Sequence, residues 1–341
     1  MKAGASLGLL LGWLLLVATV SSAEHPSSPL TELTLVAEQA VDGMPSGNLS
    51  GLAWCGGALW ALSDRDDDRL YRLSSVQGVW QARAEVFVAP PVPASGLSWG
   101  QRVRNDVSGL LRGGDLDFEG LSCDAAGNRY LVSEAQVAVL QITPQGPASW
   151  LNLPPSLLRQ ARASGMLWQF NGLFEGVAID PAGQRLWLAA ERQNRGLLAL
   201  YQESSRWGCQ GSCVLLSEAG ELAAPASIGG EMQPNDFADL AFFNEKLFTL
   251  ERLAHQICRR NPQDGSVERC WSFAAEALTE ARRYDQPYGL AEALWIDADG
   301  AWLGLDNGAS SSSGGQARGD GEARPIVWRF AAPAGGWDAA S

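Results

Sequence analysis

Acidic residues recur in pairs along this chain, at positions from which a ring of carboxylates could bind a cation or transfer protons. Five segments each place two polar or acidic residues 12 to 16 residues apart, and successive segments start 69, 56, 64 and 53 residues from one another. Such spacing predicts that the pairs occupy equivalent places in a repeated structure. The first members are Ser50, Glu119, Glu175, Asp239 and Glu292, and the second members are Asp64, Glu134, Glu191, Glu251 and Asp306.

Each pair encloses two short apolar stretches separated by a turn, which is the pattern of a β-hairpin. Several of these turns, at 124–128, 180–184 and 297–300, open on Asp and contain a Gly that readily adopts a positive φ. Further strand-like stretches follow, such as 69–73 and 197–201. Units of four antiparallel strands repeated with this period are typical of a β-propeller.

We therefore predict an all-β fold, a β-propeller of five blades, with six left open because the long first repeat could contain a degenerate unit. A β-sandwich would show shorter and less regular strand spacing, and helical periodicity is confined to short stretches at 156–164 and 274–283. The N-terminal segment 30–41 has no hairpin partner of its own. We expect it to supply the outer strand of the last blade, which would close the ring and remove exposed sheet edges.

In such a fold the first strand of each blade lines the channel and the second strand runs back, so both acids of a unit reach the same mouth. We expect Glu119, Glu175 and Glu292 to lie nearest the axis, and we predict that they are the catalytic carboxylates. Like charges at such distances cannot all stay ionised without compensation. A site rich in oxygen suits Ca²⁺, with Mg²⁺ as the alternative, better than zinc or copper. The predicted metal ligands are Asp64, Glu134, Glu191, Asp239, Glu251 and Asp306.

An arginine directly follows the second acid in three of the units, at Arg65, Arg192 and Arg252. These side chains either tie neighbouring blades together or bind an anionic group of a substrate through two parallel hydrogen bonds. The sequence leaves both roles open.

The shortage of histidine narrows the reaction classes. Only His25, near the N-terminus, and His255 are present, so few histidines are available as the base that a nucleophilic serine or cysteine needs. Hydrolysis of a small ester or phosphoester, assisted by a metal ion or by carboxylates, fits the residues better. The alternative is a non-catalytic propeller of the cell envelope that binds a ligand or another protein, because fold does not determine function.

The N-terminus has the features of a secretory signal peptide over residues 1–23: Lys2, an apolar run at 6–20, and Ser21-Ser22-Ala23 at the expected cleavage point. An uncleaved membrane anchor is the alternative, although the run is short for a spanning helix. Residues 24–341 are predicted to form a single propeller domain with a low-complexity loop at 309–324. The expected location is periplasmic or secreted.

Six cysteines in an exported chain indicate disulfides. Of the 15 possible pairings, the spacing favours Cys258–Cys270 across a hairpin and Cys209–Cys213 within a loop, which leaves Cys55–Cys123. The net charge of −13 argues against nucleic acid or an anionic membrane as a partner. We expect a monomer without a membrane span after signal cleavage, acting on a small-molecule ester or phosphoester.

The segment 171–191, NGLFEGVAIDPAGQRLWLAAE, resembles the signature of the phytase-like propeller family called esterase-like activity of phytase. The segments 49–64 and 118–134 resemble the earlier repeats of that family, and SdiA-regulated propellers are similar. The resemblance covers roughly residues 45–307 and implies the propeller fold and site roles for Glu119, Glu134, Glu175 and Glu191. Unit four has Ala238-Asp239-Leu240 in place of Glu-Gly-Leu, and unit five has Ala293 in place of the Gly, so unequal contributions from the blades are expected.

Overall fold

The computed structural model describes residues 30–93, 96–97, 99–103, 114–169, 172–192, 194–285, 290–308 and 316–339. The expected signal peptide and the first part of the low-complexity loop, 309–315, lie outside these residues. Within them, no helix has both the length and the apolar character needed to cross a membrane.

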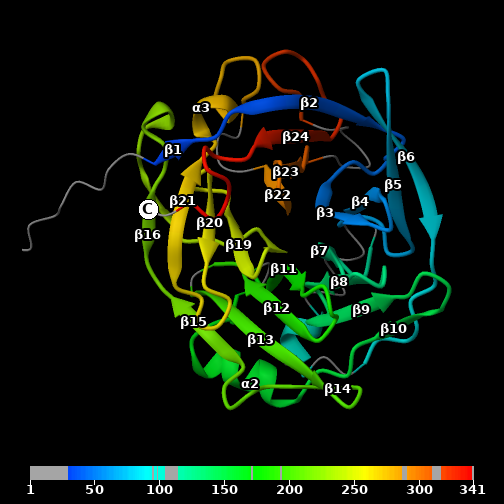
Figure 1. Cartoon of the computed structure of the whole chain (residues 1–341). Helices are drawn as coiled ribbons and strands as arrows, with labels where there is room; N and C mark the ends of the chain where they lie inside the picture. The colour runs from blue at the N-terminus through cyan, green and yellow to red at the C-terminus, as the bar shows by residue number, and fades with distance from the viewer. Residues whose placement is uncertain are drawn as a thin grey trace, which may run out of the picture.

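The chain folds as a β-propeller, in which antiparallel sheets follow one another around a common axis in sequence order (Figure 1). Units two, three and four each form a separate sheet, and units one and five are joined through β2 (Leu35–Asp42) into one eight-stranded sheet. Unit one contains β3 (Leu49–Cys55), β4 (Ala58–Ser63), β5 (Arg69–Val76) and β6 (Val79–Val86), and unit two contains β7 (Phe118–Cys123), β8 (Arg129–Ser133), β9 (Ala138–Ile142) and β10 (Ala148–Trp150).

Units three to five follow the same plan. Unit three contains β11 (Phe174–Ile179), β12 (Arg185–Ala190), β13 (Arg195–Glu203), β14 (Arg206–Gly208) and β15 (Val214–Glu218). Unit four contains β18 (Asp239–Phe243), β19 (Lys246–Glu251), β20 (Gln256–Arg260), β21 (Val267–Ser272) and the short β1 (Thr31–Glu32). Unit five contains β22 (Ala291–Asp297), β23 (Gly300–Leu305), β24 (Ile326–Ala331) and β2 (Leu35–Asp42).

The connections carry the remaining elements. They are α2 (Ser156–Ala163), the hairpin of β16 (Glu221–Ala223) and β17 (Met232–Pro234), the 3-10 helix η1 (Ala226–Ile228) and α3 (Ala274–Ala277).

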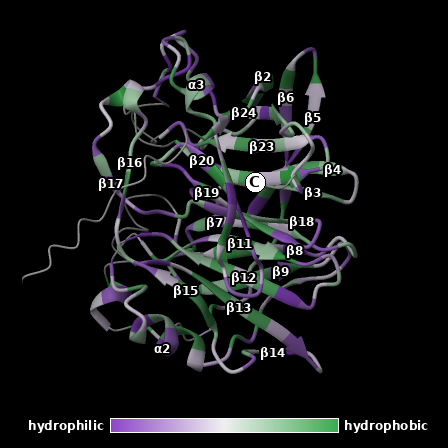
Figure 2. Cartoon of the chain, turned by 60° about the vertical axis from the view of Figure 1, so that its left-hand side comes forward, coloured by the Kyte–Doolittle hydropathy of each residue, from purple (hydrophilic) through white to green (hydrophobic). Residues whose placement is uncertain are grey.

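The first strands form the inner ring of the propeller. In the described chain, β3, β7, β11, β18 and β22 contact one another in that order, and β22 returns to β3. A cluster of buried hydrophobic side chains fills each boundary between neighbouring units, so every sheet is covered on both faces. Strands such as β11 and β12 are therefore apolar almost throughout, and Figure 2 shows hydrophobic stretches running along them.

The N-terminal segment closes the ring as predicted from the sequence, although only its later part joins unit five, since β1 pairs in parallel with β21 of unit four. Strand β2 pairs antiparallel with β24 as the outer strand of unit five, and its last two residues also pair with β6 of unit one. The sequence left open a sixth, degenerate unit within the long first repeat. In that repeat, residues 94–95, 98 and 104–113 lie outside the described part.

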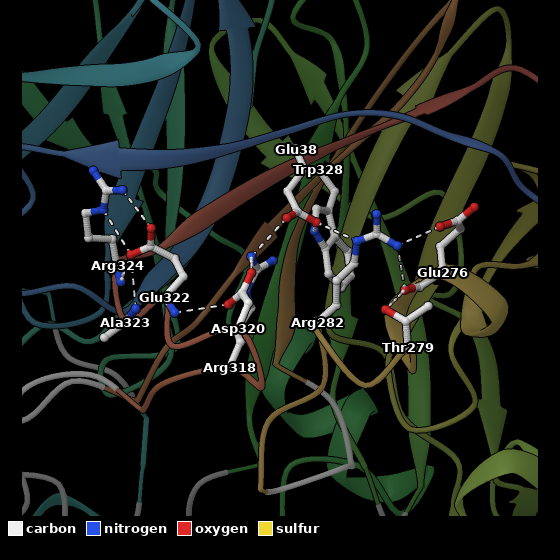
Figure 3. A network of polar contacts seen from close by, with 10 residues as sticks. All are labelled: Glu38, Glu276, Thr279, Arg282, Arg318, Asp320, Glu322, Ala323, Arg324 and Trp328. Carbon is white, nitrogen blue, oxygen red and sulfur yellow. Dashed lines mark hydrogen bonds and ion pairs between the residues drawn. The ribbon is translucent and has the colours of Figure 1, made fainter.

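A polar network fastens this closing strand to the last unit (Figure 3). Glu38 of β2 accepts hydrogen bonds from Arg282 Nε at 2.7 Å, from Arg318 Nη2 at 2.9 Å and from Trp328 Nε1 at 2.9 Å. Arg318 also pairs with Asp320, so both charged side chains of the Arg318-Gly319-Asp320 sequence are engaged within the fold. We refer to these residues as the Glu38 network.

Three disulfides join the cysteines in the predicted pairs: Cys55–Cys123, Cys209–Cys213 and Cys258–Cys270. The first connects the ends of β3 and β7 and so links units one and two, whereas the other two are local. Disulfides of this kind are typical of chains that fold in an oxidising compartment.

Candidate functional site

Several of the paired acids of the repeat line a cavity of about 230 Å³. Six carboxylates, three arginines and one serine line it, so the surface of the cavity is almost entirely polar and charged. We call it the acidic cavity. Its lining residues are Ser50, Asp64, Arg65, Glu119, Glu175, Glu191, Arg192, Arg252, Glu292 and Asp306.

A β-bulge at the start of the first strand accompanies each inner-ring side chain that reaches this cavity. The pairing between the first and second strands skips one residue in four of the units. A bulge leaves its extra residue unpaired and redirects the side chain, which is a common arrangement beside active sites. The skipped residues are Ser50, Glu119, Glu175 and Glu292.

The glycine after the bulge explains why the sequence repeats Gly at this point. A Cβ at Gly120 would lie 2.8 Å from the carbonyl oxygen of Glu175, and one at Gly176 would lie 2.8 Å from the amide nitrogen of Leu240. Only a residue without a side chain allows the inner strands of neighbouring units to approach so closely. The Glu-Gly step therefore combines a redirected carboxylate with close packing of the ring.

Unit four departs from this arrangement, as its sequence indicated. Asp239 occupies the position of the glycine, and it pairs with Leu250 without a bulge. Its carboxylate is buried and accepts hydrogen bonds from the amide of Leu240 at 2.8 Å and from the amide of Leu294 in unit five at 2.7 Å. The structure therefore does not bring this predicted metal ligand into the acidic cavity.

Two other predicted metal ligands, Glu134 and Glu251, are not among the residues that line the cavity. Glu134 is buried and accepts a hydrogen bond from the amide of Leu173 at 2.9 Å. Glu251 is in ion pairs with Arg260 at 2.7 Å and with Arg195 at 3.0 Å. Burial raises the pKa of Glu251, but these two arginines outweigh it and lower the pKa overall. The other predicted metal ligands, Asp64, Glu191 and Asp306, do line the cavity.

Arg252 neutralises one side of the cavity. Its guanidinium donates to Glu191 of unit three and to Glu292 of unit five, and its Nε lies 3.5 Å from Asp236. Arg65 and Arg192 are about a third exposed and pair with the acids beside them, Asp64 at 3.3 Å and Glu191 at 2.8 Å. The cavity thus has an arginine-rich side and a side where carboxylates face one another.

The carboxylate-rich side contains a group of acids that could hold a metal ion. Oxygen atoms of Asp64, Asp117 and Glu119 all lie within 4.8 Å of one another. Asn48 is completely buried beside Asp64, and its amide oxygen accepts no hydrogen bond in the described structure. Carboxylate and amide oxygens are the ligands that Ca²⁺ and Mg²⁺ prefer, so the residues present fit a hard divalent cation. We call these four residues the cation cluster.

The electrostatics of the cavity favour protonated carboxyl groups. Burial, with a contribution from Asp306, raises the pKa of Asp64 to about 7, and burial raises the pKa of Glu292 to about 8 despite Arg252. Burial raises the pKa values of Glu119 and Glu175 well above the ordinary range. Neighbouring acids raise them further, chiefly Glu175 in the case of Glu119 and Glu191 in the case of Glu175. With pKa values of about 7 and about 8, Asp64 and Glu292 can exchange protons near neutral pH.

Two acids of the site were not anticipated from the sequence. Asp117 precedes β7 by one residue, and its place two residues before Glu119 in the repeat was the available signal. Asp236 lies in the connection before β18, and burial raises its pKa to about 7 although Arg252 lowers it. Asp236 stands two residues before Ala238, which takes the Glu position of unit four, so the repeat offered the same signal as for Asp117; its pairing with Arg252 depends on the fold.

His255 does not line the acidic cavity. It is buried, and burial lowers its pKa to about 4, so the imidazole is neutral at physiological pH. The chemistry of the cavity therefore depends on carboxylates and arginines.

Comparison with known proteins gives a family match and distant structural similarity. Residues 44–253 match the model of the family described as "Phytase-like: Esterase-like activity of phytase". No curated protein matches the sequence. A glutaminyl cyclase from Myxococcus xanthus is 12% identical with a TM-score of 0.49, over 89% of this chain and 97% of that one.

The PQQ-bound aldose sugar dehydrogenase from Streptomyces coelicolor is 14% identical with a TM-score of 0.40, over 89% of this chain and 98% of that one. At these identities the two structural similarities carry no information about function.

Proposed function

The chain belongs to the phytase-like family, and on this premise we propose that it is an exported hydrolase of small esters or phosphoesters that works in the acidic cavity. The observation that carries the proposal is the pair of bulged carboxylates, Glu119 and Glu175, which line one cavity with raised pKa values, Glu119 as a member of the cation cluster and Glu175 outside it. We further propose that the protein is a monomer in the periplasm or outside the cell, which is consistent with its three disulfides.

Glu175 is the better general acid or base of the three carboxylates first chosen from the sequence. Glu292 is engaged by Arg252, and Glu119 belongs to the cation cluster. Glu175 lines the cavity and forms no ion pair among the described residues. In hydrolysis the ionised carboxylate of Glu175 accepts a proton from the attacking water, and it then donates this proton to the departing alkoxide.

A divalent cation bound by the cation cluster would polarise the ester or phosphoryl oxygen of the substrate. The residues of the protein would hold this cation and orient the substrate. Asp64, Asp117, Glu119 and the amide of Asn48 would hold the cation, with Ca²⁺ preferred and Mg²⁺ as the alternative. Arg65 and Arg192, the more exposed arginines, would orient an anionic group of the substrate.

The test is hydrolysis of p-nitrophenyl acetate and p-nitrophenyl phosphate by the mature protein, with added Ca²⁺ or with chelator. We expect turnover of at least one substrate, and a loss of roughly 10²-fold or more in kcat for Glu175→Gln, in line with the usual contribution of general acid–base catalysis. Glu218→Gln is the matched control, because Glu218 is a partly exposed glutamate that pairs with Arg195 outside the cavity.

Failure of every ester in the panel, with the protein folded, would contradict the hydrolase proposal. Retention of full activity in Glu175→Gln would remove this residue from the mechanism. Calorimetric binding of inorganic phosphate that depends on Arg65 and Arg192, without turnover, would instead support the alternative, a ligand-binding propeller of the cell envelope.

A further inference from the structure

A second cavity lies apart from the acidic one. It is a groove of about 800 Å³ between the turn that joins β8 to β9 and helix α2, and it shares no lining residue with the acidic cavity. Leucines of the 151–158 segment, together with Trp150 and Trp168, give it apolar walls. Its size and character are those of a small-molecule site, which is typically an apolar cleft with a few fixed polar groups.

The two tryptophans of this groove are held in place by hydrogen bonds. Trp150 donates from Nε1 to the carbonyl oxygen of Pro90 at 2.9 Å, and its ring stacks against Phe118 with centroids 6.3 Å apart. Trp168 donates from Nε1 to the carbonyl oxygen of Arg162 at 3.0 Å, yet its side chain is 63% exposed. An exposed indole fixed at the rim of an apolar groove is well placed to stack on a planar ligand.

Arg162 of α2 supplies a positive charge that has no carboxylate partner within the described part of the chain. Its Nη2 donates to the neutral side chain of Gln101 at 2.6 Å, and its Nε is buried without a hydrogen-bond partner among the described residues. The guanidinium carbon lies 5.3 Å from the centroid of the Trp168 ring. A buried donor without an acceptor is costly, so the site favours a ligand that brings an acceptor with negative charge.

We propose that this groove binds a small organic anion with an aromatic body, such as an aromatic carboxylate or sulfonate. The anionic group accepts from the free Nε of Arg162, and the aromatic body lies against Trp168 and the apolar wall. The charge of Arg162 selects the anion, and the volume of about 800 Å³ suits a drug-sized molecule. The proposal concerns a site separate from the acidic cavity, so it stands or falls independently of the hydrolase.

Isothermal titration calorimetry of the mature protein with two matched probes tests this site. Naphthalene-2-sulfonate carries a negative charge, and 2-naphthol has the same ring system but is neutral at pH 7. Because a hydrogen bond to a charged group contributes about 1.5–3 kcal/mol, we expect the sulfonate to bind at least roughly tenfold more tightly than the naphthol. Arg162→Met should abolish this preference while leaving weak binding of both probes.

Two further variants make the result specific. Trp168→Ala removes an exposed side chain, so it should fold normally and weaken the binding of both probes. Arg129→Met is the matched control, because Arg129 also stacks on a tryptophan, Trp60 at 4.4 Å, but pairs with Glu85 elsewhere in the molecule. Equal affinity for the two probes, absence of binding at millimolar concentration, or an unchanged preference in Arg162→Met would each overturn the proposal.

Discussion

The guanidinium of Arg252, at the end of the second strand of unit four, donates to the carboxylate of Glu191, at the end of the second strand of unit three. The same guanidinium reaches Glu292 of unit five and lies close to Asp236. One buried cation thus compensates three acids and joins three neighbouring units. Of the two roles that the sequence left open for the arginines, these contacts favour a tie between blades for Arg252.

Replacement of Arg252 by methionine should therefore destabilise the fold. The substitution leaves Glu191, Asp236 and Glu292 without their shared cation, and breaking a buried ion pair on one side typically costs about 3–5 kcal/mol. Urea unfolding followed by circular dichroism measures the change. Arg69→Met is the control, since Arg69 pairs with Asp68 at a more exposed site and should cost no more than about 1 kcal/mol. Equal effects of the two substitutions would contradict the role assigned to Arg252.

The raised pKa values predict that the metal-free protein loses stability as the pH rises. Asp64 titrates near 3.8 when unfolded and at about 7 when folded, so the native state binds more protons between these values. The free energy of unfolding must then fall as the pH rises through this window. Glu292, at about 8, extends the fall. Glu38 and Glu251 have lowered pKa values, and their opposite contribution lies below their ordinary value of 4.5. His255, whose pKa is lowered from 6.5 to about 4, opposes the fall only below about pH 6.5.

Urea unfolding in the presence of chelator, at intervals between pH 5 and 8, measures this slope. Asp64→Asn should make it shallower, because an amide does not titrate. A stability that stays constant or increases over this range would show that the cavity carboxyls are ionised in the folded protein.

Calcium should stabilise the protein through Asp117. A ligand that binds only the native state adds about 2.7 kcal/mol at 100 times its dissociation constant. We expect Ca²⁺ to raise the melting temperature of the unsubstituted protein and to have little effect on Asp117→Asn, which loses one charged oxygen of the cation cluster. Asp338→Asn, on the exposed surface, should respond like the unsubstituted protein. An identical Ca²⁺ response in all three proteins would place the ion elsewhere.

The Glu38 network should contribute to closure of the ring. Glu38→Gln removes the charge that Arg282 and Arg318 share, and we expect a loss of about 1.5–3 kcal/mol, the usual contribution of a hydrogen bond to a charged group. Glu322→Gln is the control, because its partner Arg324 is 43% exposed and surface pairs contribute little. Chemical unfolding compares the two, and a smaller effect for Glu38 than for Glu322 would show that closure depends on β2 pairing alone.

Much of the fold could be predicted because it depends on local and repeated patterns. The hairpins, the closing strand at 30–41 and the three disulfide pairs follow from apolar alternation, turn residues and cysteine spacing, and the structure confirms them. The convergence of Glu119, Glu175, Glu191 and Glu292 on one cavity also agrees with the repeat. Equivalent positions in a ring face a common axis, whatever the details of packing.

The tertiary structure decided which acids line that cavity and which residues each of them contacts. A bulge presents Glu119 and Glu175, whereas Asp239, at the glycine position and without a bulge, binds backbone amides instead. Arg252 meets its acids from neighbouring units, and Asp117 joins the cation cluster although it stands outside the pattern. The sequence by itself determined the repeat and the ring. Burial and contacts between residues far apart in the chain determined the partner and the proton affinity of each carboxylate, and no local pattern encodes those.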